Sequence, residues 1–555
     1  MKKILFAGSL LIGSFLVGIS VFAEQVGIDN DAGWGTGRSL ILKTGIVLLL
    51  LSVAGIVFKD KLTVLEQRIS EAANKFGKIK YSTQMVIFSL PITIIVITSY
   101  LWFSLPNFDD SGFKYYSSLA IAFKKHQLYL VDEPSPALLA LDNPYDYGLR
   151  KRSGVDDFPW DVSLYNDKYY LYWGPVPSLA LTLFSAERLY YIGDEYLVLV
   201  FTCGLYFYCL LFCYSIWLKF NQALPPWLFG IVILAIGLSA PITLMLNSSR
   251  IYEAAIVGCQ FFFICGCYWV FSYLNDKSLH PYKIILAGLH WALALGTRVT
   301  ILPVLIFATG MTLFYIFKQM RPFSPKSYLT ILASLCLPMA IAGIGLGWYN
   351  WIRFNSVFEF GIKYQLANVD YNIFKDSFST KYIKGNFYSY FFHPIKFQGR
   401  FPYLQPIENT FTNERLAGLV YTSPYFLFAM FFVGIFSPRK KSFSDQDEGL
   451  LRGWLIPTLI GSSLIAMATF LSFYFPTSRY GEDFLPSLLL LATISLGLGY
   501  RFVDKNKITE KAYIIFAALV AIYSVIASML IAIQPNRTKL VVIFIKEVYK
   551  ALGGR

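Results

Sequence analysis

The chain has 555 residues, of which 56% are hydrophobic, 18% aromatic and only 15% charged. A soluble domain carries roughly 25% charged residues, so this composition excludes an ordinary soluble fold. The formal net charge of +14 could indicate a nucleic-acid partner. However, the basic residues lie in short segments between apolar runs rather than on one face, so we predict no nucleic-acid partner.

Apolar runs long enough to cross a bilayer recur along the whole chain. A hydrocarbon core about 30 Å thick needs around 20 apolar residues per helix. We therefore predict an all-α polytopic membrane protein with about 13 transmembrane helices. Their expected ranges are 4–23, 39–58, 84–105, 194–218, 226–246, 252–274, 283–297, 300–317, 328–350, 421–437, 453–475, 484–501 and 511–533. The run 283–318 is too long for one crossing, so we place a break at Gly296, Thr297 and Arg298.

Lys and Arg concentrate in alternate loops, which indicates one orientation in the cytoplasmic (inner) membrane. The N-terminus is expected inside, and two long loops, at about 106–193 and 351–420, are expected on the extracytoplasmic side. The apolar run that ends at Ala23 fits a cleavable signal peptide equally well.

The chain is expected to have three parts. Residues 1–83 form a helix pair and a cytoplasmic loop, residues 84–503 form the membrane core with both long loops, and residues 504–555 form a last helix and an interfacial tail. Segment 178–192 is apolar but contains Glu187 and Arg188, which favours an interfacial or re-entrant helix. Segment 59–83 either lies on the inner leaflet or is an ordinary orienting loop.

Paired acids, Asp109 and Asp110, follow the third apolar run at the expected outer membrane boundary. Adjacent carboxylates next to lipid repel each other and are poorly solvated, so the pKa of at least one should rise. A carboxylate of this kind is suited to act as a general base. Acids that merely mark a helix end in water give the same pattern, so the interpretation depends on the rest of the loop.

The loops are rich in aromatic and polar side chains. Aromatic faces stack on sugar rings while carboxylates, amides and guanidinium groups bind hydroxyls, so the mixture is typical of a carbohydrate site. An interfacial aromatic belt has a similar composition. The residues predicted to bind substrate are Tyr115, Tyr116, Asp161, Tyr170, Trp173, Glu253 and Lys363.

Several arginines lie at predicted helix ends, where an idle charge would be costly. Arg250, Arg298 and Arg479 are expected on the same side of the membrane. A phosphate-bearing lipid would need such cations, because arginine binds phosphate with two parallel hydrogen bonds and keeps its charge near lipid. Anchoring at the interface or pairing between helices is the alternative. The four histidines lack ligand spacing, so no metal site is predicted. The sequence has neither a P-loop nor a dinucleotide fingerprint, which argues against a cytosolic nucleotide-powered enzyme.

Between about 84 and 500 the chain resembles the GT-C superfamily of polytopic glycosyltransferases, which includes protein O-mannosyltransferases and the aminoarabinose transferases of lipid A. The segments that carry the resemblance are Asp109-Asp110 with Tyr115-Tyr116, the turn 169–177, Glu253, Gly296-Thr297-Arg298, the stretch 349–354 and the stretch 479–484. One departure is that three apolar helices precede the first long loop, where the superfamily commonly has one.

The resemblance implies a GT-C-like enzyme that transfers a sugar from a polyprenyl-phosphate donor to an extracytoplasmic glycan, lipid or protein, usually with inversion. Asp110 or Asp109 would be the general base, and Arg298, Arg353 and Arg479 would neutralise the leaving phosphate. No cofactor is predicted, and a divalent cation is compatible but not indicated. The alternatives are a non-enzymatic transporter or flippase of lipid-linked saccharides, and a glycan polymerase or ligase.

Overall fold

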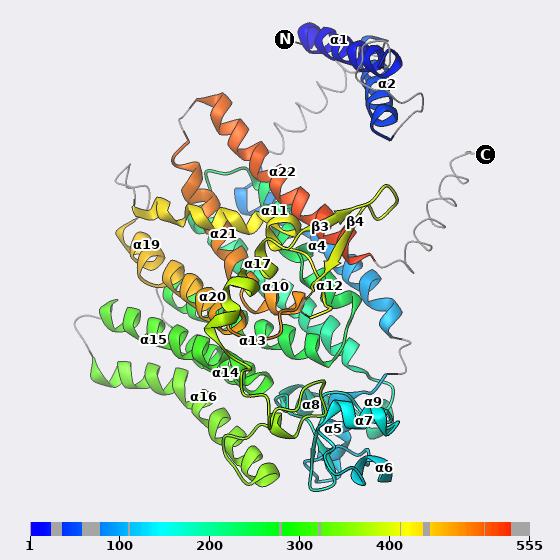
Figure 1. Ribbon diagram of the computed structural model, residues 1–555. Coiled ribbons are helices and arrows are strands. Elements are labelled where there is room, and N and C mark those ends of the chain that lie inside the picture. The colour runs from blue at the N-terminus through cyan, green and yellow to red at the C-terminus, as the bar shows by residue number, and fades with distance from the viewer. Residues whose placement is uncertain are drawn as a thin grey trace. The chain divides into compact units, whose positions relative to one another are not determined.

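The computed structural model describes residues 2–23, 36–57, 78–108, 112–276, 280–319, 324–410, 412–436, 444–503 and 506–533 (Figure 1). The chain divides into two compact units, 1–84 and 85–555. Most described residues are helical, which confirms the expectation of a helical membrane protein in this general form.

The first unit contains helices α1 (Lys2–Val21) and α2 (Thr36–Val57), which pack against each other. A Cβ on Gly45 of α2 would meet the backbone nitrogen of Val17 at 2.9 Å, so glycine allows this close approach. The Arg38 guanidinium donates to the backbone oxygen of Ser20 at 2.7 Å and so satisfies a carbonyl at the end of α1.

Seven helical stretches among the described residues are long and apolar enough to cross a membrane. They are α4 (Tyr81–Ser104), α10 (Asp194–Phe220), α13 (Ile251–Asn275), Val299–Gln319 with α15 (Leu302–Gln319), α16 (Pro325–Phe354), Asp445–Leu471 with α19 (Asp445–Leu450) and α20 (Ile456–Leu471), and α22 (Lys507–Ala532). Shorter apolar helices of the second unit are α11 (Pro226–Leu238), η5 (Pro424–Phe436) and α21 (Leu485–Tyr500). Helix α14 (Tyr282–Thr297) is also short. A count of about 13 crossings stays a prediction.

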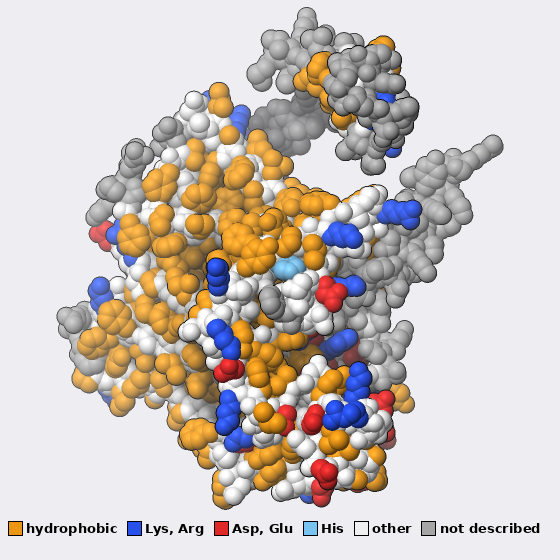
Figure 2. All heavy atoms as spheres, in the orientation of Figure 1, with side chains coloured by type: hydrophobic (Ala, Val, Ile, Leu, Met, Phe, Trp, Pro, Cys, Tyr) orange, Lys and Arg blue, Asp and Glu red, His pale blue; other side chains and the backbone are white. Residues whose placement is uncertain are grey.

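The core lies around α13 and α21, whose side chains are mostly buried. Helix α13 packs against α10 and α14, and α21 packs against η5, α10 and α20. In contrast, α16 exposes apolar side chains such as Ile344, which is 74% exposed. Figure 2 shows hydrophobic side chains spread over the outer helices and charged side chains gathered near α5 to α9. This distribution fits a lipid-facing bundle with a polar end.

Two helix interruptions bear on the site. Helix α14 ends at Thr297 and Arg298 is extended, as the length of the run 283–318 predicts. The range 226–246, expected as one helix, is instead divided into α11 and α12 (Ile242–Asn247), with Pro241 between them. Proline lacks an amide donor and clashes with the preceding helical turn, which explains the division.

The range 421–437, expected as a membrane helix, is mainly a 3-10 helix, whose 13 residues span roughly 26 Å.

The first long loop contains α5 (Tyr115–Lys124), α6 (Pro136–Leu139), α7 (Tyr147–Arg152), the antiparallel hairpin β1 (Ser163–Tyr165) and β2 (Lys168–Tyr170), α8 (Val176–Leu181) and α9 (Ala186–Leu189). The segment expected as one interfacial or re-entrant helix is therefore two short helices. The second long loop contains α17 (Ile383–Phe391), the antiparallel strands β3 (Ile395–Phe397), β4 (Leu404–Glu408) and β5 (Arg415–Leu416), and α18 (Leu419–Thr422).

The two long loops are joined by backbone and side-chain hydrogen bonds. The backbone nitrogen of Leu366 donates to the oxygen of Val162 at 2.8 Å, and that of Asp161 donates to the oxygen of Leu366 at 3.2 Å. The buried guanidinium of Arg150 donates to the backbone oxygens of Pro144 and Ala367. The start of the second loop is therefore joined to the first loop where Figure 1 shows α5 to α9, whereas strands β3 and β4 of the second loop lie beside α22.

The tail helix α22 packs within the second unit. The hydroxyl of Ser528 accepts from the backbone nitrogen of Ala240 at 2.8 Å and donates to the backbone oxygen of Thr422 at 2.8 Å. This helix thus contacts both the α11–α12 connection and α18. Residues 59–77 of the segment 59–83 lie outside the described residues, as does the tail that follows residue 533.

Candidate functional site

The site begins at the first turn of α13. The carboxylate of Glu253, which is 4% exposed, accepts from the backbone nitrogen of Arg250 at 3.1 Å. This contact satisfies a donor that a helix start otherwise leaves unpaired. It also holds the Glu253 carboxylate at the start of α13.

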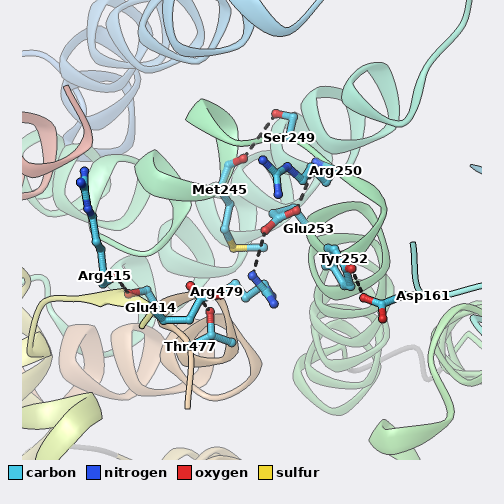
Figure 3. Close-up of polar contacts among 11 residues, drawn as sticks. Asp161, Met245, Ser249, Arg250, Tyr252, Glu253, Glu414, Arg415, Thr477 and Arg479 are labelled. Atoms are coloured by element: carbon cyan, nitrogen blue, oxygen red, sulfur yellow. Dashed lines mark hydrogen bonds and ion pairs between the residues drawn. The ribbon is translucent and has the colours of Figure 1, made fainter. Parts of the chain in front are cut away.

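Arg479 lies on η7 (Ser478–Asp483), the turn between α20 and α21. Its Nη1 is 3.9 Å from Oε1 of Glu253, and its guanidinium carbon lies 4.7 Å from the ring centroid of Tyr252 (Figure 3). The same carbon is 5.7 Å from the ring of Tyr480. Arg479 is therefore held by one carboxylate and two aromatic rings.

Arg298 lies in the extended connection after α14 and contacts the same turn. Its Nη1 is 2.5 Å from Oδ1 of Asp483. Its guanidinium carbon is 5.1 Å from the ring centroid of Phe470 and 5.6 Å from that of Tyr480. The side chain of Arg298 is 12% exposed and that of Asp483 is 4% exposed. The second arginine of the site is thus also paired with its own acid.

Asp161 brings a carboxylate from the first long loop to this cluster. Its φ of 59° is in the left-handed region, which aspartate tolerates better than most residues. The Tyr252 hydroxyl donates to its Oδ2 (Figure 3). Burial raises the pKa of the Asp161 carboxyl, while the Tyr252 hydrogen bond and the charge of Arg479 oppose that rise. Asp161 is therefore linked to Arg479 through one aromatic side chain.

Aromatic rings line the side of the site next to the first loop. Trp173 lies 5.3 Å from Tyr252 and 6.0 Å from Tyr115 between ring centroids. The backbone nitrogen of Gly174 donates to the oxygen of Thr297 at 3.2 Å. A Cβ on Gly174 would lie 2.1 Å from the backbone oxygen of Gly296, so only glycine permits this approach. This contact holds Trp173 beside the end of α14.

Six of the residues selected from the sequence therefore lie around Tyr252 and Tyr480. They are Tyr115, Asp161, Trp173, Glu253, Arg298 and Arg479. Tyr116 is fully buried on α5, where its phenol interacts electrostatically with Arg298. This convergence joins the first long loop to the start of α13, the end of α14 and the turn η7.

Three other selected residues lie outside this cluster. The Arg353 guanidinium donates to the backbone oxygen of Leu171 at 2.7 Å and to Oδ1 of Asn350 at 2.8 Å. Tyr170 packs on Phe354, with ring centroids 5.2 Å apart, and Lys363 is exposed and pairs with Glu359. The guanidinium of Arg353 therefore forms hydrogen bonds with other residues of the protein, apart from the cluster around Tyr252 and Tyr480.

Asp109 and Asp110 lie outside the described residues, and their catalytic role stays a prediction. Sequence reasoning missed Tyr252, Tyr480 and Asp483 as site residues. The signal for Asp483 was present, because two acids directly precede an apolar run and follow Arg479. The contacts of Tyr252 and Tyr480 had no such signal, because tyrosine is common throughout this chain.

No protein-family model, no curated protein and no solved structure matches this chain.

Proposed function

We propose that the protein is a membrane glycosyltransferase that moves a sugar from a polyprenyl-phosphate donor to an extracytoplasmic acceptor. The observation that carries the proposal is the contact of a loop carboxylate, Asp161, with Tyr252, on which the guanidinium of Arg479 lies. A proton acceptor and a phosphate-binding cation thus occur together at one end of an apolar helix bundle. Both groups are needed for this reaction.

The cationic half of the site suits the phosphate. Arg298 and Arg479 are mostly covered, and a guanidinium binds phosphate oxygens with paired, charge-assisted hydrogen bonds. Such cations stabilise the charge that forms on a leaving phosphate. The lipid tail of the donor would remain in the bilayer beside the apolar helices.

The other half of the site suits a hydroxyl-bearing acceptor. Asp161 accepts the proton of the acceptor hydroxyl, and the hydroxyl oxygen of the acceptor forms a bond to the anomeric carbon of the sugar. The bond between that carbon and the phosphate oxygen breaks, and the lipid phosphate leaves with the negative charge. Tyr115 and Trp173 supply ring faces next to the carboxylate. Attack opposite to the leaving group inverts the anomeric carbon.

The proposed site faces the extracytoplasmic side of the cytoplasmic membrane, and the distribution of Lys and Arg in the loops supports this orientation. The proposed acceptor is a glycan, a lipid or a protein that carries a hydroxyl on that side of the membrane. Asp110 or Asp109 is the alternative base, because both belong to the same loop.

Purified protein in liposomes, supplied with labelled polyprenyl-phosphate sugars and candidate acceptors, tests the proposal. We expect Asp161→Asn to abolish glycosyl transfer, because an amide cannot accept the proton. Asp167→Asn is the matched control, since Asp167 is exposed in the same loop and also has a positive φ. Transfer that survives Asp161→Asn but disappears in Asp110→Asn would assign the base to Asp110 instead.

A transporter or flippase of lipid-linked saccharides is the second candidate. It is favoured by the buried acid Glu482, because ionisable groups inside a helix bundle commonly mark transport pathways. Movement of the labelled lipid across the liposome bilayer without any new glycosidic bond would support this candidate and exclude the enzyme.

A further inference from the structure

Two adjacent acids, Glu482 and Asp483, are buried at the end of η7. Asp483 pairs with Arg298 through Oδ1, but its Oδ2 has no hydrogen-bond partner among the described residues. Within the same part of the chain, neither carboxyl oxygen of Glu482 has a partner. Glu482 lines a cavity of about 10 Å³, which has room for about one water molecule.

The groups around the two acids include a single cation among the described residues. Glu482 faces Tyr100 from α4 and Tyr206 and Cys209 from α10. The Tyr100 hydroxyl donates to the backbone oxygen of Gly237 at 2.6 Å. Asp483 interacts with Arg298 after α14, Tyr390 on α17 and Tyr480 on its own turn. From α13, Cys259 lies near its carboxylate, and the Gln260 side-chain amide is a neutral donor that contacts Asp483 and also donates to its backbone oxygen at 3.1 Å. On the same turn, Arg479 lies next to Glu253 instead.

The net charge of Glu482, Asp483 and Arg298 is therefore zero only if one of the two acids is protonated. A buried carboxylate without a cation is strongly unfavourable, and such a group takes up a proton instead. Asp483 has the guanidinium as its partner and Glu482 has none, so Glu482 carries the proton. The neutral set is then protonated Glu482 with ionised Asp483 and Arg298.

An anion that binds Arg298 changes this balance. The ligand competes with Asp483 for the guanidinium, which leaves the Asp483 carboxylate buried with a second negative charge nearby. The neighbouring side chain, Glu482, already holds a proton and cannot compensate. Asp483 must therefore be neutralised.

We infer that an anion captured by Arg298 is bound together with one proton, which Asp483 accepts. The balance is simple: the ligand replaces the carboxylate at the guanidinium, and that carboxylate becomes a carboxylic acid with a proton from solvent. Release of the anion returns the proton. This inference rests on the proposed function in taking a lipid phosphate as the anion, and it makes donor binding weaker as pH rises.

Titration calorimetry of the purified full chain with farnesyl phosphate tests the inference. At pH 8.5 the ligand is fully ionised, since the second pKa of a phosphate monoester is about 6. Heats measured in two buffers of different ionisation enthalpy give the number of protons bound. We expect uptake of about one proton per ligand in the wild type. Asp483→Asn should still bind but take up none, and Glu482→Gln should take up the same amount as the wild type.

Asp447→Asn is the matched control, because Asp447 forms an ion pair with Lys219 away from η7 and should leave the uptake unchanged. Wild-type binding without proton uptake, or no binding of farnesyl phosphate, would overturn the inference, and the wild-type result decides even if a variant does not fold. Loss of uptake in Glu482→Gln but not in Asp483→Asn would overturn the assignment to Asp483. Proton-linked binding with no sugar transfer from any donor would support the inference and reject the glycosyltransferase.

Discussion

Arg298 and Arg479 contact the same ring, that of Tyr480, with their guanidinium carbons 5.6 Å and 5.7 Å from its centroid. Each arginine has its own buried acid, Asp483 for Arg298 and Glu253 for Arg479. Two positive charges are thus held near each other without an uncompensated charge. A phosphate that binds between them must compete with carboxylates, so the site should be sensitive to changes in either partner.

Arg479→Gln should weaken use of a polyprenyl-phosphate donor, because it removes a cation at the ring of Tyr252. Charge-assisted hydrogen bonds contribute about 1.5–3 kcal/mol, so we expect kcat/KM for the donor to fall about 10- to 150-fold. Arg479→Lys should recover only part of this loss, since a lysine lacks the planar fork. Initial rates over a range of donor concentrations measure the effect, and exposed Arg188→Gln is the control. Equal donor kinetics in Arg479→Gln and the wild type would exclude Arg479 from phosphate binding.

The pH dependence of transfer should reflect Asp161. Burial raises the pKa of this carboxyl, so activity should fall with decreasing pH already above the usual aspartate value of about 3.9. The Tyr252 phenol stabilises the charged form and lowers this pKa, so Tyr252→Phe should move the acid limb to higher pH. The phenyl ring preserves the surface under Arg479. A pH–rate profile measures the shift, and an acid limb that moves to lower pH in this variant would contradict the assignment.

Gly174→Ala should disturb the packing of the first loop on α14. The added Cβ would lie 2.1 Å from the backbone oxygen of Gly296, which neither backbone can accommodate without moving. We expect a loss of about 1–3 kcal/mol in the free energy of unfolding, together with a loss of transfer. Gly385→Ala is the control, because no atom lies within 4 Å of a Cβ built at that position. Denaturant titrations in detergent measure both variants, which should differ clearly in midpoint.

Arg150→Lys should loosen the junction between the two long loops. The guanidinium donates to carbonyls of both loops, and one ammonium cannot reach both in the same geometry. The free energy of unfolding should fall by about 1–3 kcal/mol. Amide hydrogen exchange of the segment around Leu366 should become faster, whereas exposed Arg152→Lys should leave it unchanged. Unchanged exchange in Arg150→Lys would show that the other hydrogen bonds between the loops are sufficient to hold them together.

Local patterns predicted the apolar helices and the break at Arg298, because both follow from the length of hydrophobic runs. The division of the range 226–246 was not predicted, although Pro241 was visible in the sequence. Of the predicted phosphate-binding arginines, Arg298 and Arg479 lie together, whereas the donors of Arg353 bind Leu171 and Asn350. Nothing in the residues around Arg353 distinguishes a ligand-binding arginine from one that joins loops.

The sequence by itself determined that this is a helical membrane protein, because whether a helix can cross a bilayer depends on the apolar composition and the length of one segment. Only the tertiary structure decided that Asp161 meets Tyr252 and that Asp483 takes Arg298 as its partner. These contacts join residues far apart in the chain. A charge or hydroxyl finds its partner through the packing of whole helices and loops, and one stretch of residues does not specify that packing.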